Sequence, residues 1–434
     1  MSHAMRRRGI HVIWLLALSL SGCQRAQDAG NAHGDYAVHE WTMPSAPGAA
    51  DPDLVATGDG RLLLSWIDSV PGRRNALQFA QFGDRGHWQS GARTIAVGDA
   101  LVPRWANAPH MTYTADGALW AQWLQRARDP DGALDVMLAR SADGGFNWSA
   151  PARINAVTDA ADRGFVALWP ATRDSVGAAW LDSGPLPAPT SAADAAAGGN
   201  GTADMHDMSP SNGSTSLHAA LFDQQLAAHA QAQVDARVCD CCQTDAVSTP
   251  RGALLVYRDR SADEVRDIRA TRFDGARWTP PVPVHADHWT MRACPVNGPS
   301  VAAAGNDVVV AWYTAAADTP TVSLARSRDG GDHFDAPVVV ERGAAVQGRV
   351  AVALDARQAW VLWLREDASG QSLWLARYAP DLSRQLQRLR VATLQGRGRA
   401  TGYPQLALHG GDAYIVWTDV VGAAPQLHGV VVSR

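Results

Sequence analysis

One short pattern of hydrophobic and polar positions recurs seven times along the chain. Each copy is a run of apolar residues that ends in an aromatic residue and is followed by polar ones, as in LLLSWID and VVVAWYT. The aromatic residues of the seven copies, called landmark aromatics below, are Trp66, Trp123, Trp180, Tyr257, Trp312, Trp363 and Trp417. They lie roughly 50–60 residues apart, except for a longer step from Trp180 to Tyr257, and such a period predicts a repeated β-sheet unit.

Each repeat contains four strand-like runs. In the second repeat they are HMTYTAD, ALWAQWLQ, VMLARS and ARINAV, separated by turns rich in Asp and Gly. Four antiparallel strands joined by tight turns form one blade of a β-propeller. The last repeat has only three runs, and the segment 36–41 (YAVHEW) can supply its fourth strand, which hides the sheet edges. We therefore predict an all-β propeller of seven four-stranded blades closed by the N-terminal strand, with six blades as the alternative.

The N-terminal segment is typical of a bacterial lipoprotein signal peptide, over residues 1–22. Three arginines at 6–8 precede an apolar run, 12–20, which is too short to span a bilayer. The sequence LSGC, ending at Cys23, resembles a lipobox, in which the cysteine is lipidated and anchors the protein to the membrane. Gln24 stands where Asp would favour the inner membrane, so the resemblance implies the outer membrane of a cell envelope. Residues 23–35 are expected to form a flexible tether and residues 36–434 the propeller.

Composition limits the partners of this protein. All basic residues are arginine, and the rare glutamates are Glu40, Glu264, Glu341 and Glu366. The formal net charge is −5, and loss of three arginines with the signal peptide makes the chain more acidic. A net negative charge disfavours nucleic acid as a partner. We expect a monomer.

Two loops, 141–148 and 327–334, share the pattern S-x-D-x-G-x-x-W/F, and each falls between the third and fourth strands of its repeat. The Asp carboxylate can accept N–H groups within the hairpin, Gly allows positive φ, and the aromatic residue can pack against the blade. These loops resemble the Asp-boxes, or bacterial neuraminidase (BNR) repeats, of the sialidase superfamily. The resemblance implies a propeller fold, and we expect no Asp-box residue to be catalytic.

The alternation of strands determines which loops share a face of the propeller. Loops that lead into first strands lie on the same face as loops that follow second strands, and the Asp-boxes lie on the other. Because first strands are innermost, the loops leading into them surround the central axis, where propeller ligands commonly bind. These loops carry a polar set: Asp51, Asp53, Asn107, His110, Arg163, Cys241, Cys242, Gln243, Cys294, Asn297, Arg349 and Tyr403.

Sialidases use a Tyr nucleophile assisted by a Glu, an acid/base Asp, and arginines that clamp the substrate carboxylate. Tyr403 precedes a first strand, as the family's nucleophile does, and Glu264 on the same face could be its base. Asp51 or Asp53 could be the acid. The residues expected to bind substrate are Arg163, Arg258, Arg266, Arg349, Asn297 and Gln243.

The sequence also departs from the sialidase pattern. It lacks the F/Y-R-I-P segment that carries the family's first arginine, and the nearest string, Arg153-Ile154-Asn155, lies in a fourth strand. The family's enzymes have six blades, whereas this sequence has seven repeats. The sequence therefore predicts a lipoprotein that binds or hydrolyses a glycan or other anionic ligand at the axial mouth, as an exo-α-sialidase-type hydrolase if it is an enzyme.

A block rich in cysteine suggests an alternative function. VCDCCQTDA (238–246) and ACPVNGPSV (293–301), with the charged loop between them, resemble a block found in bacterial sialidase-like lipoproteins. In an oxidising compartment four thiols normally form disulfides, and we expect a bond between Cys242 and Cys294 that joins adjacent blades.

The alternative is a non-catalytic envelope protein with a metal or redox site. Cys239, Cys241, Cys242 and Cys294 could gather as thiolates around Cu or Zn, although the sialidase-like function itself requires no cofactor. The insertion 184–214 follows a second strand and is expected to be disordered. It carries the further candidate ligands Met205, His206 and Met208.

Overall fold

The computed structural model describes residue 1 and residues 35–434, apart from 70–71, 73, 84–85, 90, 128–132, 156–160, 186–214 and 423. Residues 2–22 of the predicted signal peptide lie outside the described residues, as do Cys23, Met205, His206 and Met208. In the unit Tyr36–Arg434, the described residues form seven four-stranded antiparallel sheets. The predicted all-β, seven-bladed propeller is thereby confirmed. No helix among the described residues is long and apolar enough to cross a membrane.

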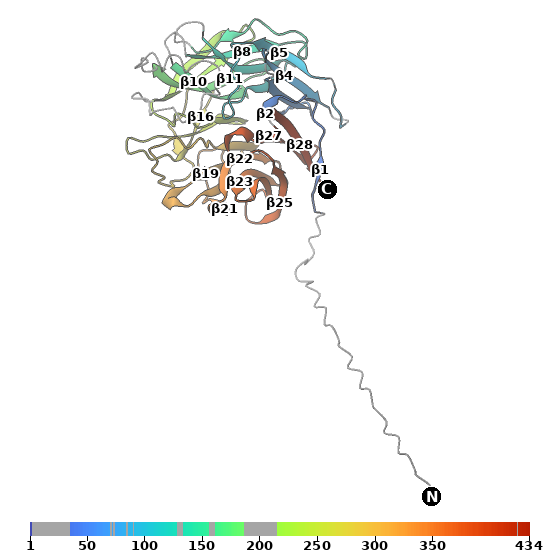
Figure 1. Ribbon diagram of the computed structural model, residues 1–434. Coiled ribbons are helices and arrows are strands. Elements are labelled where there is room, and N and C mark those ends of the chain that lie inside the picture. Colours follow the sequence, from blue (N-terminus) through green and yellow to red (C-terminus); the bar gives the residue numbers. More distant parts are fainter. Residues whose placement is uncertain are drawn as a thin grey trace, which may run out of the picture. The chain divides into compact units, whose positions relative to one another are not determined.

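Six blades are built from four consecutive strands each (Figure 1). The first three blades are β2 (Ala49–Ala56), β3 (Leu62–Asp68), β4 (Asn75–Phe82) and β5 (Arg93–Gly98); β6 (His110–Tyr113), β7 (Leu119–Arg126), β8 (Leu134–Ser141) and β9 (Ala152–Arg153); and β10 (Ala161–Pro170), β11 (Val176–Pro185), β12 (Ser216–Phe222) and β13 (Ala228–Asp235). The next three are β14 (Asp245–Thr249), β15 (Gly252–Arg258), β16 (Ile268–Phe273) and β17 (Val282–Pro283); β18 (Ser300–Ala304), β19 (Asp307–Thr314), β20 (Thr321–Ser327) and β21 (Val338–Arg342); and β22 (Val346–Leu354), β23 (Ala359–Asp367), β24 (Gly370–Tyr378) and β25 (Gln385–Leu394). Two short 3-10 turns, η2 (Ala316–Asp318) and η3 (Gly398–Thr401), lie between strands.

The seventh blade joins distant parts of the sequence. It consists of β26 (Gln405–His409), β27 (Asp412–Val421), β28 (Ala424–Ser433) and, as its outer strand, β1 (Ala37–Glu40). β1 pairs antiparallel with β28, and Ala37 lies opposite Ser433 (Figure 1, blue beside red). Tyr36, which precedes β1, is 4% exposed and packs edge-on against Trp360 of blade 6. The N-terminal strand therefore closes the propeller, as the sequence predicts.

The landmark aromatics form the contacts between blades. Each lies in the second strand of its blade, and none is more than 6% exposed. Trp66 of blade 1 packs with blade 7, Trp123 of blade 2 with blade 1, and Trp312 of blade 5 with blade 4. The other four likewise pack against the preceding blade. Burying a large aromatic side chain at every boundary explains why the pattern recurs once per repeat.

The first strands contact one another in a closed ring, in the order β2, β6, β10, β14, β18, β22, β26 and back to β2. Side chains join these strands by accepting backbone N–H groups of the next blade. Asp53 accepts from Met111 at 2.8 Å, Asn107 from Phe165 at 2.7 Å, and Asn297 from Arg349 at 2.7 Å. These polar residues therefore satisfy backbone groups that would otherwise be buried without a partner.

The two Asp-box-like loops adopt the local geometry expected from their chemistry, between β8 and β9 and between β20 and β21. Asp143 accepts the N–H groups of Phe146 and Asn147 at 3.0 and 2.9 Å. Gly145 has a φ of 88°, and Trp148 packs edge-on against Phe79 of the preceding blade. These loops are structural turns that fasten one blade to its neighbour.

Candidate functional site in the axial cavity

A cavity of about 470 Å³ lies among the first strands, and residues of all seven blades line it. Strand register places one residue of each blade at an equivalent position, opposite the residue that precedes the landmark aromatic. Asp53, for example, pairs with Ser65, and His110 pairs with Gln122. These seven cavity-lining residues, which we call the axial layer, are Asp53, His110, Ala167, Asp245, Ser300, Ala351 and Gln405.

Hydrogen bonds within the axial layer join four of its five polar members in two pairs. His110 Nδ1 lies 3.0 Å from Asp53 Oδ1, and Ser300 Oγ donates to Asp245 Oδ2 at 3.1 Å. Asp245 also accepts the N–H of Val301 at 2.8 Å. The His110 side chain is deep inside the ring of blades, yet 31% of it is exposed because it faces the cavity. The layer therefore offers carboxylate, imidazole, hydroxyl and amide groups to a ligand.

Burial raises the pKa of two carboxyl groups in the cavity. It raises the pKa of Asp51 to about 6, against a weaker opposing hydrogen bond from the Arg104 backbone. It also raises the pKa of Asp245 to about 6, although three hydrogen bonds and His110 oppose the effect. Burial would lower the pKa of His110, but Asp53 and Asp245 together outweigh it and raise that pKa above its usual value. Asp51 and Asp245 consequently titrate closer to neutral pH than free carboxyl groups do.

Two aromatic residues line the cavity at the end where the first strands begin. The rings of Trp105 and Tyr403 stack at 5.9 Å with an interplanar angle of 19°. Gln243 lies at the same end, where it donates to Ala106 O at 2.7 Å and accepts from Gly298 N at 3.0 Å. This end of the cavity thus combines flat apolar surfaces with a fixed amide group, a combination common in ligand sites.

The structure holds the predicted nucleophile, Tyr403, and its predicted base, Glu264, in separate sets of contacts. The Tyr403 hydroxyl donates to Val296 O, and burial raises the pKa of Tyr403, with Arg349 and Gln243 only partly opposing this. Glu264 forms ion pairs with Arg260 and Arg266 at 2.9 and 3.0 Å, and the hydrogen bond from Arg260 is the main cause of its lowered pKa. Among the described residues no carboxylate is hydrogen-bonded to Tyr403, so the sialidase dyad is not assembled.

The four predicted clamp arginines are buried in structural contacts and do not line the cavity. Arg258 donates to the carbonyl groups of Asn297, Arg266 and Tyr313 at 2.9, 2.6 and 2.6 Å. Arg349 donates to Thr401 Oγ1 and to the carbonyls of Gly398 and Gly402. Arg163 pairs with Asp182 at 2.8 Å, and Arg266 with Glu264 and Met291 O. These guanidinium groups hold blades and loops together.

Register shifts in the first strands explain where Arg163 and Arg349 lie. In blade 3 the pairing with the second strand shifts between Gly164 and Ala167, and in blade 6 it shifts between Gly348 and Ala351. Phe165 and Arg349 have φ angles of 52° and 49° there. A bulge of this kind redirects the side chains around it. Of the predicted site residues, Asp51, Asp53, Gln243 and Tyr403 line the cavity, whereas Asn297 bonds the next blade.

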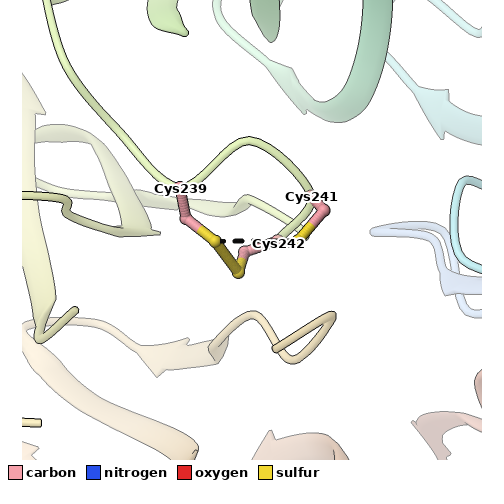
Figure 2. A group of neighbouring side chains, drawn as sticks. All are labelled: Cys239, Cys241 and Cys242. Atoms are coloured by element: carbon pink, nitrogen blue, oxygen red, sulfur yellow. Dashed lines mark hydrogen bonds between the residues drawn. A yellow bond between two sulfur atoms is a disulfide. The ribbon is translucent and has the colours of Figure 1, made fainter. Parts of the chain in front are cut away.

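The disulfide pairing differs from the prediction. The structure joins Cys239 to Cys242, with a Cα–Cα distance of 5.7 Å (Figure 2). It also joins Cys241 to Cys294, with a Cα–Cα distance of 6.1 Å, so the predicted bond between Cys242 and Cys294 is wrong. The loop turns back on itself, which brings Cys242 to Cys239 and leaves Cys241 to reach the next blade. The role foreseen for the bond, linking loops of adjacent blades, falls to Cys241 instead.

Sequence reasoning singled out His110 and Asp53 but missed Asp245, Ser300, Gln405 and Trp105. The signal that could have found them is the distance in sequence to the landmark aromatic of the same blade. Every axial-layer residue precedes that aromatic by about 12 or 13 residues, because a hairpin connects the two paired strands. Counting back from each landmark identifies the layer.

No protein-family model and no curated protein matches the chain. Similar solved structures include a protein of unknown function from Dyadobacter fermentans, 14% identical with a TM-score of 0.49, over 92% of this chain and 98% of that one. The intramolecular trans-sialidase from Ruminococcus gnavus is 11% identical (TM-score 0.47, 75% and 94% covered). The GH93 α-L-arabinofuranosidase of Fusarium graminearum is 12% identical (TM-score 0.45, 92% and 98% covered).

Likenesses this remote carry no argument about ligand or activity. The chain is defined by its own architecture, a seven-bladed β-propeller with an aspartate-lined axial cavity.

Proposed function

We propose that this protein binds the end of a neutral glycan in its axial cavity and does not hydrolyse sialosides. The observation that carries the proposal is the composition of the cavity wall. Its charged residues, within the described part of the chain, are Asp51, Asp53, Asp245 and His110, and no arginine lines it.

The chemistry of this wall suits a sugar without charge. Carboxylate oxygens accept hydrogen bonds from sugar hydroxyl groups, and such charge-assisted bonds are stronger than neutral ones. Trp105 and Tyr403 provide apolar ring surface for the C–H groups of a sugar. An anionic sugar would meet several carboxylates with no arginine to balance its charge. Neutral glycans are therefore favoured over the anionic ligands that the sialidase resemblance implies.

Hydrolysis of the sialidase type needs a tyrosine that is activated by a nearby carboxylate. Tyr403 instead donates its hydroxyl proton to a backbone carbonyl, and Glu264 is neutralised by arginines. We therefore expect the native protein and Tyr403→Phe to show the same negligible turnover of a fluorogenic sialoside. Turnover by the native protein that disappears in Tyr403→Phe would refute the binding-only proposal.

Binding can be tested on an array of neutral and sialylated oligosaccharides, followed by calorimetry with the best neutral ligand. Gln405 lies in the axial layer, where no hydrogen bond holds its side chain among the described residues. In Gln405→Trp the indole would occupy the cavity, and we expect affinity to fall about a hundredfold or more, equivalent to about 3 kcal/mol.

The matched control is Gln225→Trp, which places the same side chain in an exposed turn between β12 and β13. It should leave affinity unchanged. Binding confined to sialylated ligands, or equal binding by native protein and Gln405→Trp, would contradict an axial site for neutral glycans.

We also propose that the propeller is held at the outer membrane through a lipid on Cys23. The support is the sequence alone: a basic and apolar N-terminal segment that ends in LSGC. Cys23→Ser should move the protein from the membrane fraction to the soluble fraction and abolish incorporation of labelled palmitate. A Cys23→Ser protein that stays in the membrane fraction would contradict this anchor.

A further inference from the structure

Three sulfur atoms of the cysteine block lie in one compact group (Figure 2). The Sγ atoms of Cys239, Cys241 and Cys242 all lie within 4.8 Å of one another, and Cys239 Sγ is 4.0 Å from Cys241 Sγ. Cys294 adds a fourth sulfur, because it is bonded to Cys241. Within the described part of the chain this is the one place where three such metal-binding side chains gather.

We propose that, once its two disulfides are reduced, this group binds a single Zn²⁺ ion through four cysteine thiolates. Zinc prefers tetrahedral sulfur coordination with Zn–S bonds of about 2.3 Å, which separates the sulfur atoms by about 3.8 Å. The unbonded pair Cys239–Cys241 already has nearly this separation. The two bonded pairs need to move apart by less than the length of one C–C bond on each side. Three of the four sulfur atoms thus lie close together before the metal arrives, and Cys294, which is bonded to Cys241, must turn toward the other two when that bond opens.

The backbone that carries the cysteines is fixed by contacts other than the disulfides. Val238 N donates to Thr215 O at 2.8 Å, and Cys239 N donates to Arg258 O at 3.0 Å. On the other side of the loop, Gln243 bonds to Ala106 and Gly298. The loop therefore keeps its course when the sulfur–sulfur bonds open, and little conformational entropy is lost when the metal binds.

The surroundings favour thiolates over thiols. Cys239, Cys241 and Cys242 are no more than 1% exposed, so an anionic site needs nearby positive charge. Two guanidinium groups of the same block, Arg258 and Arg266, are buried to within 2% exposure. Arg258 has only carbonyl partners for its hydrogen bonds, so its charge is not neutralised by a carboxylate contact. A four-thiolate zinc site carries a net negative charge. Arg266 is already paired with Glu264, so Arg258, whose backbone carbonyl accepts the N–H of Cys239, is the cation of this block that would offset it.

Reduction can begin at Cys294, which is the only partly exposed member of the group. Two molecules of a dithiol, or two of a phosphine together with two of water, supply the four electrons and four protons that convert the two disulfides to four thiols, and the reductant leaves as cyclic disulfide or phosphine oxide. Zn²⁺ then binds the four sulfurs and releases the four protons to solvent. Disulfide formation and metal binding use the same sulfur atoms, so each state excludes the other.

The test compares the mature chain in its oxidised and reduced forms. Protein reduced anaerobically with a phosphine and then desalted is titrated with Zn²⁺ against a chromophoric chelator. We expect the reduced form to take up one tightly held zinc per chain that the oxidised form does not, and Co²⁺ in its place to give the intense bands of tetrahedral thiolate coordination. Prior alkylation of the reduced protein should abolish both signals.

Variants separate the proposed site from zinc binding by surface histidines. Cys294→Ser removes the fourth ligand and leaves the Cys239–Cys242 pair. The zinc that the protein withholds from the chelator, and the cobalt bands, should therefore be lost or strongly weakened. Near-UV circular dichroism of the buried tryptophans checks that this variant is folded. If the variant does not fold, native protein that was alkylated after reduction replaces it as the protein without thiolate ligands. Equal zinc uptake by oxidised and reduced protein, cobalt spectra without thiolate bands, or full affinity in Cys294→Ser would each overturn the proposal.

Discussion

At the scale of single residues, polar side chains near the axis have two different tasks. The side-chain oxygens of Asn107 and Asn297 accept hydrogen bonds from backbone N–H groups of the next blade. Asp53 does the same with one oxygen and holds His110 with the other. Asp51 accepts a hydrogen bond from the Arg104 backbone, but the residue is only 6% exposed, and burial outweighs that bond in setting its pKa. A polar residue in a first strand is therefore evidence of blade-to-blade bonding before it is evidence of ligand binding.

Asp51 should make the stability of the protein depend on pH. Its folded pKa of about 6 exceeds the value of about 3.9 for an unfolded chain, so the folded state binds the extra proton between these values. The contribution of Asp51 to stability therefore falls as pH rises from about 4 to 6 and is constant above. We expect Asp51→Asn to raise the free energy of unfolding by up to about 3 kcal/mol at pH 8 and by nothing near pH 4. Urea unfolding at both pH values measures this, and an equal effect at the two would contradict it.

At the scale of the element, one strand and one turn type account for most of the repeat. The second strand places its landmark aromatic against the preceding blade, and the Asp-box-like turns fasten the outer strands. In the second of these turns Asp329 accepts the N–H groups of Asp332 and His333, both at 3.0 Å. Burial would raise the pKa of Asp329, but hydrogen bonds from His333 and Ser327 outweigh it and lower the pKa to about 2.

Asp329→Ala should therefore destabilise the propeller at neutral pH by about 1–3 kcal/mol, because two N–H groups lose their acceptor. Since the folded pKa is depressed, this contribution is present above about pH 4 and disappears as pH falls towards 2. Urea unfolding at pH 7 and pH 3 should show the difference shrinking at the lower pH. Asp335→Ala removes a nearby exposed ion pair with Arg328 and should change stability little. A similar loss of stability in both variants would contradict the stabilising role of the Asp329 hydrogen bonds in the turn.

The sequence was sufficient to predict these elements because their signals are local. A landmark aromatic lies within the strand that it predicts, and S-x-D-x-G lies within the turn that it predicts. The cavity was harder to foresee, since Asp245 and Gln405 reach the axis only through register across a hairpin. Arg163 and Arg349 do not line the cavity because bulges turn that part of the strand, and a bulge leaves no clear mark on hydrophobic alternation. The pairing of Cys241 with Cys294 depends on the path of one loop, which no spacing rule supplies.

At the scale of the whole molecule, ring closure decides stability. Every blade boundary buries an aromatic residue, and the boundary between blades 6 and 7 also buries Tyr36. Arg377 lies 3.8 Å from the centroid of the Tyr36 ring, and the Tyr36 backbone N–H donates to Gln387 at 3.2 Å. The strand that follows hides the edge of β28, which would otherwise be open to pairing with another chain.

A chain that begins at Trp41, and so lacks β1 and Tyr36, should be less stable than one that begins at Asp35. Loss of the buried Tyr36 ring alone should cost about 3–5 kcal/mol, by analogy with aromatic truncations in protein cores. We also expect oligomers, because the edge of β28 is uncovered. Thermal unfolding and light scattering on the two chains test both effects. Equal melting temperatures and two monomers would show that closure contributes little.

The pairing of Ala37 with Ser433 also has a consequence for biogenesis. A ribosome delivers the closing segment before any of the other blades, and its partner emerges only after all of them. The nascent propeller therefore remains an incomplete arc, with its last interface unmade, until translation has passed β28. Folding in this protein ends with the two most distant parts of the polypeptide finding each other, a search over long contour length that proceeds slowly. Factors that shield unpaired strands during folding would be needed most in that interval.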